Sequence, residues 1–178
     1  MDIDQFKGRL GAGGARPNQF KVKLAFPSYV GNVDPSYSLL VSGAALPAST
    51  VNPAIIQYRG REVKLAGERI FDPWTITVVN DTGFSLRRPF EAWMEGMNGK
   101  LDNEGILDPS LYQVNIEIEH LDRNNIALPG GVYQLQGAFP IQMSEIGLQY
   151  AQNDIIEEFT VTFQYQAYTV LGEVTPSS

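Results

Sequence analysis

The sequence lacks cysteine altogether and has a single histidine, His120, among its 178 residues. Without cysteine there are no disulfide bonds, thiolate metal ligands or cysteine nucleophiles. One histidine cannot build a histidine-rich metal site, and a Ser-His-Asp triad would have to use that one residue. We therefore expect no catalytic residue, no metal site and no cofactor, and we interpret the protein as a non-enzyme.

Charge is also scarce. Only 19% of the residues are Asp, Glu, Lys or Arg, against about 25% in a typical soluble domain. Such a composition is typical of a chain that covers much of its surface with partners. The 13 basic and 20 acidic residues give a net charge of −7 and an isoelectric point near 4.7. A general nucleic-acid binder is disfavoured, because phosphate contacts need a basic surface.

Long apolar runs are missing as well. No run approaches the ~18 residues that a membrane-spanning helix would need. The N-terminus has no basic region followed by an apolar core, so we expect neither a signal peptide nor membrane anchoring.

What the chain does have is the two-residue period of β-strands. Hydrophobic residues make up 43% of the sequence, enough to bury a core. The most regular alternation sets Phe159, Val161 and Phe163 against polar neighbours. Besides a hairpin, alternation and turn residues predict strands over 18–26, 37–45, 74–79, 112–118, 133–139, 146–150 and 158–168.

One segment changes period. Leu86, Phe90, Trp93 and Met97 recur every three or four residues, which predicts an amphipathic helix over 85–97 with Ser85 as its N-cap. The predicted fold is mainly β: an antiparallel β-sandwich or barrel with one packed α-helix.

The sequence predicts that the chain is divided into three parts. Residues 1–14, with a glycine-rich end, form a flexible N-terminal arm, 15–170 form the domain, and 171–178 form a C-terminal tail. Within the domain, residues 51–65 predict a β-hairpin turning at Arg59-Gly60. Its residues are mixed in polarity, so it suits an interface better than a core of its own.

Two other functions compete with an assembly role. Exposed aromatic residues such as Tyr29 and Tyr37 would suit a carbohydrate-binding β-sandwich module, and a hydrolase would need two carboxylates at a short separation. The remaining aromatic residues fit a core between helix and sheet better than a sugar site: these are Phe71, Trp74, Phe90 and Trp93. The acidic turn at Asp102, Glu104 and Asp108 lacks the spacing of a calcium loop and is interpreted as solvated.

Several longer strings resemble the tail tube protein of contractile-tailed bacteriophages. They are Ala15–Phe20, Ala45–Ala48, Val63–Asp81, Phe139-Pro140, Gly147-Leu148 and Phe159–Thr162. The block Val63–Asp81 is the most specific, and the similarity spans about residues 15–170. The family is related to the tubes of tailocins and of type VI secretion. Residues 27–38 stand out as an insertion in the loop after the first strand.

The resemblance implies a ring-forming fold: hexameric rings of β-sandwich subunits that stack into the inner tube of a contractile tail. The tube would carry genomic DNA into the host without binding it specifically. Partners would be other copies of the chain, the tail sheath protein, and the baseplate and tail terminator proteins. The protein would be located in the virion tail after assembly in the host cytoplasm.

Residues for these roles follow from the strand pattern. Contacts between subunits or rings are expected from the arm and the hairpin: Arg16, Ile55, Tyr58, Arg59, Arg61 and Val63. A polar, net negative lumen wall is expected from Gln113, Asn115, Glu117 and Glu119. The alternative lumen face consists of Thr160, Thr162, Gln164 and Gln166.

Overall fold

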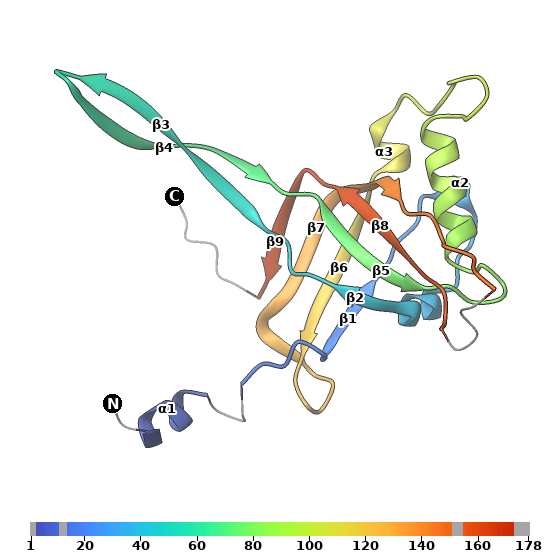
Figure 1. The fold of residues 1–178 in the computed structure, drawn as a ribbon, viewed down its shortest axis with the longest axis horizontal. Helices are drawn as coiled ribbons and strands as arrows, with labels where there is room; N and C mark the ends of the chain where they lie inside the picture. The colour runs from blue at the N-terminus through green and yellow to red at the C-terminus, as the bar shows by residue number, and fades with distance from the viewer. Residues whose placement is uncertain (1–2, 11–13, 151–154, 173–178) are drawn as a thin grey trace.

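The computed structural model describes residues 3–10, 14–150 and 155–172 (Figure 1). Its strands are β1 Phe20–Lys23, β2 Val41–Ala44, β3 Ser49–Tyr58, β4 Arg61–Phe71, β5 Trp74–Val79, β6 Val114–Leu121, β7 Ala127–Met143, β8 Glu158–Gln164 and β9 Ala167–Leu171. Its helices are α1 Ile3–Arg9, α2 Arg87–Met97, α3 Pro109–Tyr112 and the short 3₁₀ helices Ser28–Val30 and Pro35–Leu40.

Seven of these strands form one antiparallel sheet in the order β1-β6-β7-β8-β5-β2, with β9 pairing β7. The long strand β7 joins two parts of this sheet. Its first half pairs β6 and β9, and its second half pairs β8. Gly137 lies at the change, with a φ of 62° that favours glycine. The predicted antiparallel sandwich is confirmed. The sheet does not close into a barrel, because its end strands β1 and β2 are not paired with each other.

The two parts of the sheet share one core. Ile116 and Ile118 of β6 and Phe159, Val161 and Phe163 of β8 are buried, as their alternation predicts. The chain before β6 differs from the prediction, because α3 occupies the positions up to residue 112 and the strand begins only at residue 114.

Helix α2 covers an edge of this core. Phe90 and Trp93 are fully buried, with rings 5.9 and 6.1 Å from the ring of Phe163. Trp74 is buried as well, whereas Phe71 is only partly buried against the core, so the interpretation as core residues is confirmed for Phe90, Trp93 and Trp74. The helix begins at residue 87 rather than 85, and Ser85 is not its N-cap. Instead, the Asp81 carboxylate accepts hydrogen bonds from the Ser85 amide and hydroxyl at 2.7 Å each.

Several predicted elements have different bounds. The first strand is shorter, and the 3₁₀ helix Pro35–Leu40 replaces the start of the predicted strand 37–45. Residues 146–150 form no strand. The predicted strand 158–168 breaks after Gln164: β8 pairs β5 and the second half of β7, whereas β9 pairs the first half of β7. Alternation identifies the half-buried face, but the partner decides where pairing stops.

Within the predicted N-terminal arm, residues 3–9 form α1. Ile3, Phe6 and Leu10 lie on one side at helical spacing, and all three are exposed. Lys7 and Arg9 in the last turn favour the helix through its dipole. Residues 1–2 and 11–13 of the arm and 173–178 of the tail lie outside the described residues.

The loop at residues 27–38 packs on helix α2. Its Tyr29 hydroxyl donates a 2.7 Å hydrogen bond to the Trp93 carbonyl, and burial raises the pKa of Tyr29 to about 12. Its Ser38 hydroxyl accepts the amide of Leu24. The loop is therefore bound to the body of the protein by both helix and strand.

Candidate interaction surfaces

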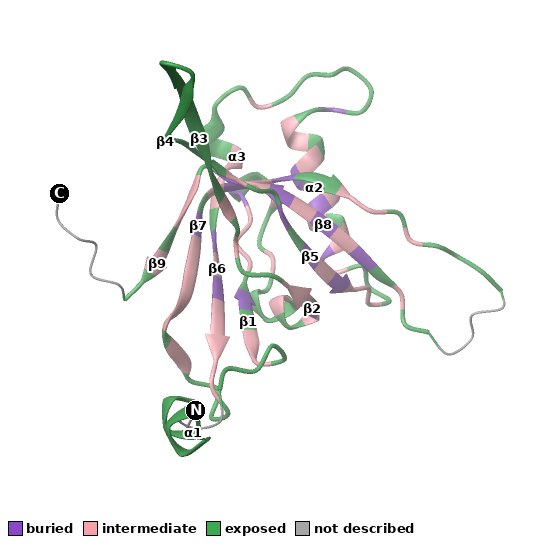
Figure 2. Ribbon diagram, turned by 60° about the vertical axis from the view of Figure 1, so that its left-hand side comes forward, coloured by how far each residue is buried: buried purple, intermediate pink, exposed green. Residues whose placement is uncertain are grey.

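The β3–β4 hairpin projects from the body of the protein as a two-stranded arm (Figures 1 and 2). It runs from residue 49 to 71, longer than the predicted 51–65, and only its two end residues are not exposed. The turn matches the prediction: Arg59 and Gly60 both have positive φ, at 49° and 79°, as a tight two-residue hairpin turn requires.

The arm is anchored to the body at its base. The Phe71 ring packs on the rings of Tyr165 and Tyr168, at 5.9 and 5.6 Å, and the Ser49 hydroxyl lies 3.3 Å from the Tyr168 hydroxyl. An isolated two-stranded hairpin is marginally stable in water. The outer part of the arm therefore gains stability if another surface covers it.

Strand pairing gives the outer part of the arm two different faces. Ile56 pairs with Val63, Tyr58 with Arg61, and Ala54 with Leu65. Because paired residues share a face and alternate residues along a strand do too, these six side chains form one surface, which we call the apolar hairpin face. Gln57, Glu62, Lys64 and Ile55 lie on the opposite face, where the Gln57 amide donates to Glu62.

This arrangement separates the predicted contact residues. Tyr58, Arg61 and Val63 lie together on the apolar hairpin face, whereas Ile55 is on the polar one. Arg59 stacks over the Tyr58 ring at 5.4 Å and makes the tip basic. Arg16 lies outside the hairpin, before β1, where its carbonyl accepts the Gln19 amide.

A second surface is the outer side of the layer β1-β6-β7-β9. Glu117 and Glu119 lie here, opposite Lys23 and Lys21 of β1. The Lys23 ammonium forms ion pairs with both carboxylates. The hydrogen bond from Lys23 to Glu119, followed in size by the one to Glu117, raises the pKa of the Lys23 ammonium above its usual value. Two lysines and two glutamates cancel, so this group of four residues carries no net charge.

The other two predicted lumen residues lie where β6 begins. The Asn115 side-chain oxygen accepts the Gly137 amide at 3.2 Å, next to the bend in β7. Gln113 precedes the strand and closes α3, with its amide bonded to the Pro109 carbonyl. The structure therefore brings the four predicted residues to one side of β6, although only three are within the strand.

The alternative polar face belongs to β5 and β8. Thr160 and Thr162 of β8 lie opposite Thr77 and Thr75 of β5, and the Thr75 and Thr162 hydroxyls are 2.9 Å apart. This surface has hydroxyl groups where the β6 surface has paired charges. Gln166 lies beyond the end of β8, where its amide donates to the Gln136 carbonyl.

The remaining candidate residues are His120 and those of the acidic turn. His120 is part of β6 and lies opposite Phe20 of β1. Asp102 and Asp108 accept amides two residues further along their own turns. Asp108 also accepts the Ser110 hydroxyl, and this bond, together with the Ser110 amide, lowers the pKa of Asp108. Within the part of the chain that the structure describes, no three acidic or histidine side chains gather as a metal site would require. No described helix is both long and apolar enough to cross a membrane.

The fold is thus that of a β-sandwich subunit with an uncovered arm, and comparison with known proteins assigns it to a family. A sequence profile described as "Phage tail tube protein" matches residues 15–171. The chain belongs to this phage tail tube protein family. The family assignment confirms the resemblance in the sequence.

Two characterised relatives agree. The tail tube protein of Serratia phage KSP90 is 26% identical over 167 residues, covering 92% of this chain and 93% of the relative. The tail tube protein gp19 of Enterobacteria phage T4 is 28% identical over 148 residues, covering 83% of this chain and 86% of the relative. The chain is accordingly a structural phage tail tube protein, located in the virion tail.

Solved structures show the same fold at lower identity. A chain of the anti-feeding prophage baseplate matches with a TM-score of 0.61 and 17% identity, covering 89% of this chain and 95% of that one. A chain of the sheath–tube complex of an extracellular contractile injection system matches with a TM-score of 0.56 and 12% identity, covering 96% of this chain and 99% of that one.

Proposed function

We propose that the protein assembles into hexameric rings that stack into the inner tube of a contractile phage tail and form the conduit for genomic DNA. The observation that carries the proposal is the layer β1-β6-β7-β9. Within the described residues, β1 pairs only with β6 and β9 only with β7, so both margins of the layer have an unpaired edge. Unpaired edges promote association in a monomer, but neighbours in a ring can cover them.

The polar outer side of this layer, with Glu117 and Glu119, is our proposed lumen wall. The ion pairs with Lys23 change the expected charge of that wall, because each glutamate lies near a lysine and the wall is balanced rather than net negative there. A balanced wall still allows DNA to pass, since the Lys23 ammonium is paired with two carboxylates and is not free to hold phosphate.

The lumen assignment is tested by replacing Glu117 and Glu119 with lysine. The group of four residues would then consist of four lysines with no carboxylate among them, so DNA should be slowed or trapped while tubes still form. The matched control is Thr75→Lys with Thr162→Lys, which places two lysines on the alternative face and should leave DNA delivery normal. Unchanged DNA delivery by the first variant, with normal tubes, would contradict the assignment.

The arm and hairpin residues are our proposed contacts between subunits and stacked rings: Arg16, Ile55, Tyr58, Arg59, Arg61 and Val63. The support is the exposure of the whole outer hairpin. The sheath, baseplate and terminator proteins are proposed as further partners, with no membrane anchoring and no catalysis. The relatives are tail tube proteins, and the similar structures come from sheath–tube, baseplate and cap assemblies.

Negative-stain microscopy of the purified protein tests the assembly. We expect hollow tubes or rings, and size exclusion should show hexamers or polymers. A protein that stays monomeric at high concentration in every salt condition would contradict the proposal. A tube from a tailocin or a type VI-like particle would assemble in the same way, and DNA inside isolated particles distinguishes the phage tail from both.

A carbohydrate-binding module gains no support from its two aromatic candidates. Tyr29 uses its hydroxyl on the Trp93 carbonyl, and Tyr37 lies in a short 3₁₀ helix.

A further inference from the structure

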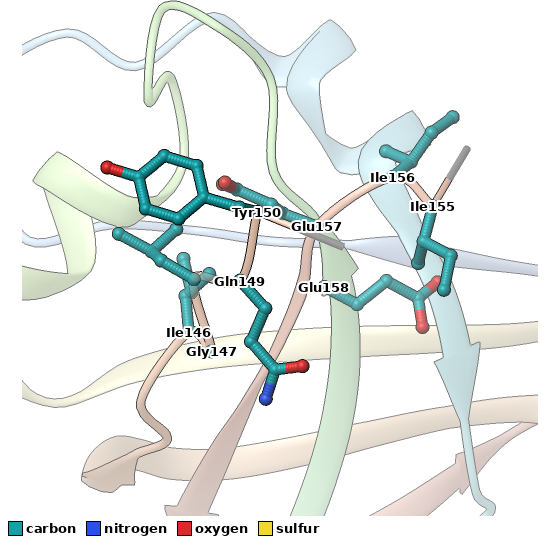
Figure 3. A pocket seen from close by; sticks show the side chains of 9 residues that line it. Ile146, Gly147, Gln149, Tyr150, Ile155, Ile156, Glu157 and Glu158 are labelled. Carbon is teal, nitrogen blue, oxygen red and sulfur yellow. The ribbon is translucent and has the colours of Figure 1, made fainter. Parts of the chain in front are cut away.

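The segment between β7 and β8 presents exposed apolar side chains. Leu148, Tyr150, Ile155 and Ile156 are 79%, 106%, 68% and 70% exposed. Together with Ile146, they line an open hollow of about 720 Å³. Figure 3 shows Tyr150 and Ile146 on one side of this hollow and Ile155 and Ile156 on the other. We call the described residues 144–150 and 155–158 the β8 entry surface.

The β8 entry surface is acidic. Glu145, Glu157 and Glu158 lie within it, and its described residues include no Lys or Arg. Glu157 accepts the Asn80 amide and Glu158 the Ser42 hydroxyl. Both partners are neutral, so these two bonds leave the negative charge of the carboxylates uncompensated.

The hairpin has the complementary properties. Residues 49–71 contain four basic and two acidic side chains, a net charge of 4 − 2 = +2, and two of the basic residues are Arg59 and Arg61 at the tip. The apolar hairpin face leaves Ile56, Tyr58 and Leu65 about half exposed, at 52%, 60% and 52%. A basic, apolar arm matches an acidic, apolar hollow in both charge and polarity.

The positions of the two surfaces determine how they can meet. Figure 1 shows the hairpin at one end of the long axis and the start of β8 at the other. One molecule therefore cannot bring its own hairpin onto its own β8 entry surface. Two different surfaces of one chain make a head-to-tail contact, which repeats from copy to copy.

From the charge match and these positions we infer that the apolar hairpin face of one copy docks on the β8 entry surface of another copy in the next ring. The inference rests on the proposed ring stacking and names the surface that receives the arm. Burial of the apolar side chains stabilises the contact, and Arg59 and Arg61 approach Glu157 and Glu158.

Cysteine cross-linking tests the pairing, because the chain has no cysteine of its own. Tyr58→Cys protein and Leu148→Cys protein are mixed with wild-type protein, assembled and oxidised. Leu101→Cys, at a side chain 99% exposed on another loop, replaces Leu148→Cys in the matched control. Two cysteines held together in a tube have an effective concentration of about 1 mM or more, so disulfide-linked dimers should exceed the control by at least about tenfold.

The outcomes separate the inference from the proposed function. If wild-type protein forms no tubes, the proposed function fails and the inference with it. If tubes form but Tyr58→Cys cross-links no better to Leu148→Cys than to Leu101→Cys, only the docking surface is wrong.

A charge exchange provides a second measurement. Arg59→Glu with Arg61→Glu should shorten the tubes, as should Glu157→Arg with Glu158→Arg. Combining all four changes should restore tube length, since each new charge again faces its opposite. If the fourfold variant forms tubes that are shorter still than those of either double variant, the proposed pairing is wrong.

Discussion

The apolar hairpin face allows assembly to be weakened without weakening the fold. We consider the triple variant Ile56→Ser, Val63→Ser and Leu65→Ser. The three side chains are 52%, 44% and 52% exposed and lie outside the core. Their replacement should change the free energy of unfolding of the unassembled protein by less than about 0.5 kcal/mol, as is usual for surface substitutions.

The effect on assembly should be much larger. Complete burial of such a side chain stabilises by about 1.5–3 kcal/mol, so covering the exposed half adds about 1 kcal/mol for each residue. The three changes then remove about 3 kcal/mol from every contact that covers the face. Since about 1.4 kcal/mol corresponds to a tenfold change in an equilibrium constant, the critical concentration for tube formation should rise about a hundredfold.

Pelleting of tubes over a concentration series measures the critical concentration, and urea unfolding of dilute protein measures stability. The matched control is Gln57→Ser with Glu62→Ser on the opposite face, which should change both quantities little. An unchanged critical concentration in the triple variant would refute the reasoning. So would an equal loss of stability, because the face would then support the fold of the single chain.

Three further changes test local features. Asp81→Asn should make the free energy of unfolding depend less on pH at the acid end. The Ser85 hydroxyl and amide lower the pKa of Asp81 below 3.8, so wild-type protein keeps this stabilisation above pH 3.8 and loses it as the pH falls further. Urea unfolding from about pH 5 to about pH 2 measures the difference. Tyr29→Phe should cost about 1 kcal/mol at neutral pH through its lost hydrogen bond. Because burial raises the pKa of Tyr29 to about 12, the wild-type advantage should shrink as the pH rises above 10. Gly67→Ala would place a Cβ 2.5 Å from the Asn52 carbonyl oxygen, so it should distort the arm and impair tube formation while urea unfolding of the body stays unchanged.

The sequence by itself determined the elements whose pattern is local. The alternation of Phe159, Val161 and Phe163 identified a half-buried strand. The four- and three-residue spacing of Leu86, Phe90 and Trp93 identified a helix over the core. The block Val63–Asp81 pointed to the family. Local periodicity suffices here because each pattern expresses one face of one element turned towards the core.

Only the tertiary structure decided which residues share a surface across strands. Lys23 and Glu117 are 94 residues apart and meet because β1 and β6 pair in one register. That register cancelled the negative charge expected for the β6 face. The hairpin differs, because the two-residue turn at Arg59-Gly60, which the sequence predicts, already pairs Ile56 with Val63 and leaves Ile55 on the opposite face. A one-residue shift in the pairing of β1 with β6 would turn every side chain of β1 to the other face, and nothing in the local alternation fixes that register.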